Sequence, residues 1–197
     1  MKFLKKLWQC FFAWNVVVSS EAKLDKVDVI VAFSFGDGES SGKSNRELAD
    51  IVLRLHRQLD IAVLAQKEVY NALPIDITNM KPPFVAEFRP FVDDMSSTPK
   101  YPNTRRVYIG VNFFLNELRF MGPYGSSFHP IFVVHSAHMW RIQQMARLDP
   151  LFEEFYIADT FSVSYDRRSF QWRTRRKINF VLLEIPARIY FLLRKWI

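Results

Sequence analysis

The stretch that decides the fold is Pro130-Ile131-Phe132-Val133-Val134-His135-Ser136-Ala137-His138-Met139-Trp140-Arg141. Residues 131–134 are a continuous apolar run, which is typical of a strand covered on both faces. The polar residues that follow indicate a helix start, which Ser136 would cap. We therefore expect a buried strand that runs directly into a helix.

This junction is where we expect function. A helix that starts at the carboxyl end of a parallel strand presents unpaired N–H groups and a positive dipole end, which favour an anionic ligand group. His138 and Arg141 stand on the first turn of that helix. We predict His138 as a ligand contact or general acid/base, and Arg141 as a donor to phosphate or carboxylate. His135 is more consistent with a core residue.

Strand and helix signals alternate along the rest of the chain. Residues 26–36 indicate a buried strand that ends in a glycine turn, and Ser44 with Glu47 indicates a capping box at a helix start. A second apolar run, 61–65, is followed by Gln66-Lys67-Glu68. The alternation predicts an α/β fold with a mostly parallel central sheet and right-handed crossovers.

Ligands bind at the carboxyl edge of such sheets. We therefore add Gly36, Gln66, Glu68 and Ser136 to the predicted ligand-binding residues. Residues 74–102 hold six prolines and predict a long covering loop with one short edge strand near 84–88. Asn103-Thr104 then caps another helix, and both residues are also predicted ligand contacts.

The two ends of the chain differ from the middle. Residues 1–22 are an apolar and basic segment, read either as a signal peptide or as a retained amphipathic helix, and 23–197 form a single domain. We expect the retained form, a cytoplasmic location and membrane association through this segment. The last helix, 174–197, is expected to pack on the domain through apolar residues that include Ile178 and Leu182, with a kink at Pro186.

The net charge of +7 lies entirely in residues 165–197, which hold nine Lys or Arg residues against Asp166 and Glu184. A local basic patch suits a phosphate-bearing ligand, an anionic membrane or nucleic acid, but it is equally consistent with a solvated helix face. Because no recognised nucleic-acid module surrounds it, we expect no nucleic-acid partner.

A second candidate cluster lies in the same region: Asp166, Gln171, Trp172 and Arg175. An aromatic plane beside acid, amide and guanidinium groups could hold a base or a sugar. The alternative, which the sequence favours equally, is a tail that ties the last helix to the sheet.

Several classes of site are excluded by residue counts and spacing. The single cysteine, Cys10, forms no internal disulfide and supports no cysteine-based zinc site. Residues 36–44 lack the spacing of a P-loop, and no Gly-x-Ser-x-Gly motif is present. The pair His135 and His138 would need a carboxylate from elsewhere to bind a metal, so we predict no metal site.

Several of these pieces together resemble the SanA/YdcF-like family of bacterial domains, some of which are linked to cell-envelope biogenesis. They are the strand 29–36, Arg46, the Asn103-Thr104 pair, the junction 135–141, the Tyr-Asp-x-x-Ser-x-Gln-Trp run at 165–172, and Glu184. The resemblance spans residues 27–197. It implies a Rossmann-like three-layer α/β sandwich with a pocket at the carboxyl edge. Where family members commonly carry an acid after the Asn-Thr pair, this chain has Arg105-Arg106, which favours binding over turnover.

The sequence thus predicts a small α/β pocket protein that binds an anionic or nucleotide-like small molecule, with S-adenosylmethionine among the candidate cofactors. The alternative is a hydrolase or transferase acting on a phosphate- or sugar-bearing envelope precursor, with His138 and Asp166 as its catalytic residues. A third reading is a membrane-associated interaction protein that uses both ends of the chain.

Overall fold

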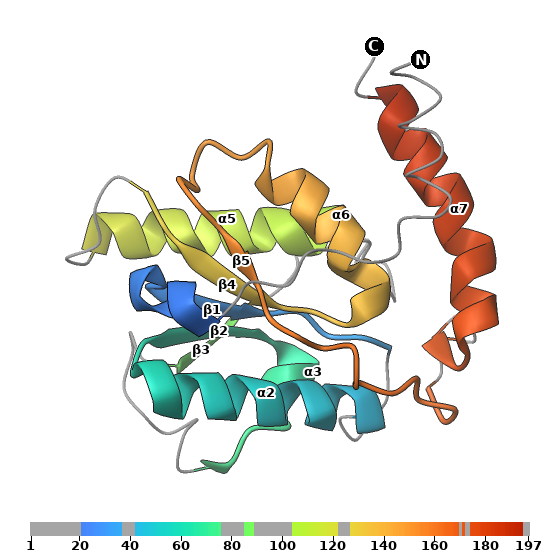
Figure 1. Cartoon of the computed structure of the whole chain (residues 1–197), viewed down its shortest axis with the longest axis horizontal. Helices are drawn as coiled ribbons and strands as arrows, with labels where there is room; N and C mark the ends of the chain where they lie inside the picture. The colour runs from blue at the N-terminus through green and yellow to red at the C-terminus, as the bar shows by residue number, and fades with distance from the viewer. Residues whose placement is uncertain are drawn as a thin grey trace, which may run out of the picture.

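The computed structural model describes residues 21–36, 42–75, 85–88, 104–121, 127–169, 171 and 174–194. In these segments one parallel sheet has the strand order β3-β2-β1-β4-β5 (Figure 1). Its strands are β1 Val29–Ala32, β2 Ala62–Gln66, β3 Val85–Phe88, β4 Pro130–Val133 and β5 Tyr156–Ile157. Every neighbouring pair is parallel, so the predicted α/β fold is confirmed.

Helices cover both faces of the sheet and complete a Rossmann-like three-layer sandwich (Figure 1). After the 3₁₀ turn η1 Glu21–Lys26, the helices are α2 Lys43–Leu59, α3 Lys67–Tyr70, α5 Thr104–Met121, α6 Ser136–Ala146 and α7 Lys177–Arg194. The first two lie on one face, and α5 and α6 lie on the other. α7 packs against α6 at the end of the sandwich.

The central strand β1 shows why its sequence is apolar throughout. Ile30 and Ala32 belong to the core beneath α2, whereas Val29 and Val31 belong to the core beneath α5 and α6. Successive side chains of a strand point to opposite faces, and here both faces are covered. The same holds for β4, so these two strands form the buried centre of the domain.

Most predicted elements are found, with differences at their ends. The predicted edge strand near 84–88 is β3. The predicted capping box at α2 is wrong: the N-cap is Gly42, Ser44 Oγ donates to the Ser164 carbonyl oxygen at 2.7 Å, and Glu47 accepts from Ser164 N at 2.6 Å. Both side chains hold a distant segment instead of their own helix end.

The orientation of α7 also differs from the prediction. The helix begins at Lys177, continues through Pro186, and turns Phe180, Glu184 and Arg188 inward. Ile178 and Leu182, which were predicted to pack on the domain, are exposed. In the segments that the structure describes, no helix is long and apolar enough to cross a membrane.

A tight turn ends β1 and brings the tail of the chain close. Gly36 has φ +78°, and a Cβ atom there would lie 2.9 Å from Ser169 Oγ and 3.0 Å from Thr174 Oγ1. The glycine therefore provides both the left-handed backbone and the space for these hydroxyl groups.

We expect Gly36→Ala to lower the free energy of unfolding by about 2 kcal/mol, because a left-handed alanine is strained and its methyl group crowds both hydroxyls. Urea unfolding measures this change. Asp60, the C-cap of α2 at φ 51°, is the matched control, since Asp60→Gly should be neutral or slightly stabilising. Equal unfolding midpoints for Gly36→Ala and the wild type would refute the packing described for this turn.

Candidate functional site

The candidate site lies at the carboxyl edge between β1 and β4. From β1 the chain proceeds outward to β2 and β3 on one side, whereas β4 and β5 lie on the other, so the strand order reverses here. The segments that leave these two strands run side by side, with Phe33 N donating to the Val133 carbonyl oxygen at 2.9 Å. Such switch points are the usual ligand positions of open parallel sheets.

His135 is a structural residue at this edge. Its Nδ1 accepts a hydrogen bond from Ala137 N at 3.2 Å, which makes His135 the N-cap of α6. The predicted cap, Ser136, is instead the first residue of the helix. The ring is buried and stacks on Phe35 with centroids 3.6 Å apart. Burial lowers the pKa of His135 to about 3, although the backbone of Ser164 and Val163 opposes this shift, so the ring is neutral.

Aromatic rings pack beside the first turn of α6. We call Phe35, His135, His138, Tyr165 and Phe180 the aromatic cluster. The half-buried His138 ring lies 5.1 Å from Phe35 and 5.1 Å from Phe180, between centroids. Tyr165 meets Phe35 at 5.5 Å, edge to face. His138 therefore contacts ring faces and edges on its inner side.

Arg141, one turn further along α6, meets a carboxylate of α7. Its Nη2 lies 2.9 Å from Glu184 Oε2, and Arg188 Nε lies 3.2 Å from Glu184 Oε1. We call these three residues the arginine–glutamate triad. The Glu184 and Arg188 side chains are buried, and the Arg141 side chain is 21% exposed. The Arg188 guanidinium also lies 4.8 Å from the Trp140 ring centre.

The electrostatics of the triad are set by burial and by its two cations. Burial raises the pKa of Glu184 above its ordinary value, while Arg141 and Arg188 oppose this shift by favouring the charged carboxylate. Burial and then the Glu184 charge raise the pKa of Tyr165 to about 12, so this phenol keeps its proton. With two guanidinium groups and one carboxylate, the triad carries a net positive charge.

Gln66 and Glu68 differ in their surroundings. Gln66 Oε1 accepts from Ser34 N at 3.0 Å and so ties the end of β2 to the segment after β1. Glu68 Oε2 is a buried oxygen with no hydrogen-bond partner in the structure. A buried polar atom of this kind is uncommon in folded proteins.

Asp166 lies at the start of α2. One carboxylate oxygen accepts from Lys43 N at 2.7 Å and the other from Arg168 N at 2.9 Å. A Cβ atom on Gly42 would collide with the Asp166 carboxylate, so the N-cap glycine is what permits this approach. A carboxylate at a helix N-terminus accepts hydrogen bonds from N–H groups that have no partner within the helix, and its negative charge interacts favourably with the helix dipole. The structure thus gives Asp166 a capping role.

The remaining tail residues are bound to one another. Thr174 Oγ1 donates to Ser169 Oγ at 2.7 Å, Gln171 N donates to the same hydroxyl at 3.2 Å, and Arg175 Nε donates to the Ser169 carbonyl oxygen at 2.6 Å. These contacts lie beside Gly36, as the tail reading of this cluster predicts. Asn103 and Trp172 lie outside the described residues, as does the side chain of Thr104, the first residue of α5.

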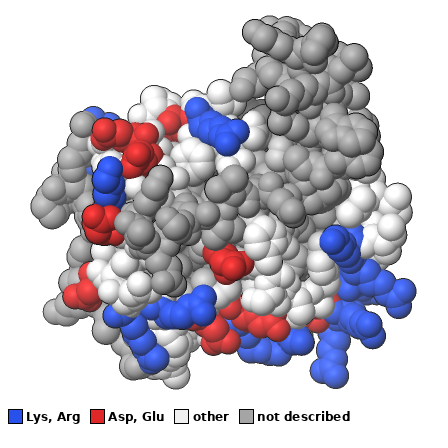
Figure 2. All heavy atoms as spheres, in the orientation of Figure 1, with Lys and Arg blue, Asp and Glu red and all other residues white. Residues whose placement is uncertain are grey.

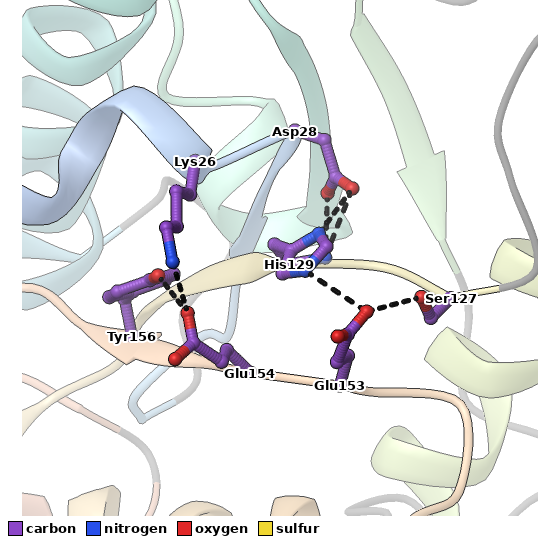
Figure 3. A network of polar contacts seen from close by, with 7 residues as sticks. All are labelled: Lys26, Asp28, Ser127, His129, Glu153, Glu154 and Tyr156. Atoms are coloured by element: carbon purple, nitrogen blue, oxygen red, sulfur yellow. Dashed lines mark hydrogen bonds and ion pairs between the residues drawn. The ribbon is translucent and has the colours of Figure 1, made fainter.

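The sequence reasoning missed a polar network at the opposite, amino edge of the sheet (Figure 3). Both Asp28 oxygens accept from His129 N at 3.0 Å, and His129 Nε2 lies 3.6 Å from Glu153 Oε2. Burial raises the pKa of Asp28 despite these donors. Tyr156 donates to Glu154, which also pairs with Lys26 at 3.6 Å. Asp28 directly before β1 and His129 directly before β4 were the available signal.

In the described segments, no group of three His, Cys, Asp or Glu residues could hold a metal ion. Comparison with protein-family models, with curated proteins and with solved structures found no match. The resemblance to the SanA/YdcF-like family therefore stays a prediction.

The low pKa of His135 leads to an expected pH dependence. The folded protein keeps this ring neutral down to about pH 3, whereas the unfolded chain takes up the proton below its ordinary pKa of 6.5. The buried neutral ring therefore lowers the free energy of unfolding only below pH 6.5, and the loss grows as the pH falls towards 3. In the wild type, this effect should lower the free energy of unfolding by about 3 kcal/mol between neutral pH and about pH 4. We expect His135→Asn, which keeps a capping oxygen, to lack this pH-dependent loss. Urea unfolding at a series of pH values tests this, and parallel profiles for both proteins would contradict it.

Proposed function

We propose that this protein binds a small molecule with an anionic group at the carboxyl edge of its sheet, through His138 and Arg141. Nucleotide-like compounds fit this description, S-adenosylmethionine among them, since its amino acid part carries a carboxylate. In this proposal the ligand's anionic group pairs with Arg141 beside Glu184, and His138 contacts the adjoining part of the ligand.

The main support for the proposal is an N–H group of Arg141 that has no hydrogen-bond acceptor in the structure. Its Nε is buried and has no hydrogen-bond partner in the structure, although its Nη2 pairs with Glu184. A buried donor without a partner costs about 1–3 kcal/mol, more when it is charged. An anion that accepts from Nε would recover this free energy and would balance the net positive charge of the triad.

The position of these groups supports the same function. α6 starts at the switch point of the sheet, where its N-terminal dipole end adds to the field of Arg141. Glu68 Oε2, also buried without a partner, lies just past the end of β2 at the same edge. It would accept from a hydroxyl or amino group of a ligand.

The alternative of a hydrolase or transferase is not proposed. It required Asp166 or Glu68 as the carboxylate partner of His138, and Asp166 already accepts two backbone hydrogen bonds at the start of α2. These contacts give Asp166 a capping role, and the proposal above uses Glu68 as an acceptor from the ligand.

Thermal unfolding of the full chain tests the proposal with inorganic phosphate, pyrophosphate, AMP and S-adenosylmethionine as probes. We expect at least one probe to raise the melting temperature, with a stabilisation of about 2.7 kcal/mol at roughly one hundred times its Kd. Arg141→Gln should abolish this shift when it is compared with the unliganded baseline of the same variant.

Arg147→Gln is the matched control, because Arg147 is an exposed arginine that caps the other end of α6. It should respond to the probe as the wild type does. The proposal fails if no probe shifts the wild type, or if Arg141→Gln responds as strongly as Arg147→Gln.

A further inference from the structure

The outer face of α7 is apolar although its inner face carries charges. Ile178 and Leu182 are each 61% exposed, and Leu183 is 44% exposed. Glu184 and Arg188 on the inner face are buried. A surface helix of a globular domain normally buries its apolar residues and exposes its charged ones, so α7 has the reverse arrangement. The apolar outer face of α7 would therefore be more stable against an apolar partner than in water.

Basic side chains gather beside the start of the same helix. Lys177, the first residue of the helix, and Arg176 just before it are exposed, and Arg167 and Arg168 are exposed in the preceding loop. Figure 2 shows basic side chains concentrated at the lower right, where Figure 1 places this loop and the start of α7. The two acids of this region have partners of their own: Asp166 accepts from Lys43 N at the start of α2, and Glu184 pairs with Arg141. Residues 165–177 hold six Lys or Arg residues against one acid, Asp166, so this stretch carries a net positive charge.

We propose that α7 docks this protein on an anionic lipid surface. Ile178, Leu182 and Leu183 would enter the boundary between headgroups and acyl chains, while Arg176 and Lys177 would pair with lipid headgroups. Amphipathic helices with an apolar face and flanking basic residues bind membranes in this way, by apolar burial and attraction to anionic lipid together. The triad and Phe180 hold the helix on α6 so that its apolar face points outward.

Charge complementarity favours lipid over the other occupants of this face. A second copy of the chain would bring one basic surface against another. Residues 1–20 hold three lysines and no Asp or Glu, so the same repulsion applies to them. A nucleic acid would match the cations but would leave Ile178 and Leu182 in water.

Sedimentation of the full chain with vesicles tests this inference. We expect binding to vesicles of phosphatidylcholine with phosphatidylserine and little binding to phosphatidylcholine alone. Two double variants, Ile178→Ser with Leu182→Ser and Arg176→Glu with Lys177→Glu, should each weaken this binding roughly tenfold or more. Circular dichroism and thermal unfolding confirm that each variant is folded.

Matched controls lie on other elements. Phe113→Ser on α5 removes an apolar side chain that is 57% exposed, and Arg54→Glu with Arg57→Glu on α2 reverses two exposed charges. These variants should bind as the wild type does. If they lose as much binding as the α7 variants, the surface is not specific and the inference is wrong.

Three further results would also overturn the inference. The first is a wild type that stays in the supernatant with anionic vesicles. The second is a chain that binds only after residues 2–20 are removed, which would make that segment the occupant of the face. The third is a dimer in solution that the Ile178→Ser, Leu182→Ser variant dissociates, which would make a second copy the occupant.

Discussion

The carboxyl edge of this protein depends on one buried carboxylate. Glu184 pairs with Arg141 on α6 and with Arg188 one turn along its own helix, and so fixes α7 against the end of the sheet. Without this acid, the buried Arg188 and the partly buried Arg141 would carry a desolvation penalty, and the shared carboxylate offsets it. Because α7 turns this charged face inward, its apolar residues face outward. The proposed ligand site on α6 thus adjoins the inner face of α7, and the proposed membrane surface is the outer face of the same helix.

Much of the fold follows from local sequence. Continuous apolar runs predict strands covered on both faces, and β1 and β4 meet that expectation because helices lie above and below them. Helix ends were predicted less well. Ser44 and Glu47 have the spacing of a capping box, but their partner is Ser164, more than a hundred residues away. Local rules cannot anticipate such a partner, because only the folded chain brings it near.

The structure around the candidate site was predicted in part. The strand-to-helix junction after β4 was predicted from an apolar run that is followed by polar residues, whereas the part of Arg141 in ligand binding stays a proposal. The tail contacts lie around Gly36, which fits one of the two readings of that cluster. What surrounds His138 could not be predicted, since Phe180 comes from α7. The period of that helix shows one apolar face, and the usual rule places it inward. The rule fails here because Glu184, on the other face, pairs with Arg141 of α6 and with the buried Arg188.

A double-mutant cycle between Arg141 and Glu184 tests this central claim most directly. The free energy of unfolding, measured by urea denaturation, is compared for the wild type, Arg141→Met, Glu184→Gln and the double variant. If the buried pair holds α7 in place, each single change costs about 3 kcal/mol and the double variant costs much less than their sum, with a coupling of about 2 kcal/mol or more. Additivity of the two single changes within about 0.5 kcal/mol would contradict the account.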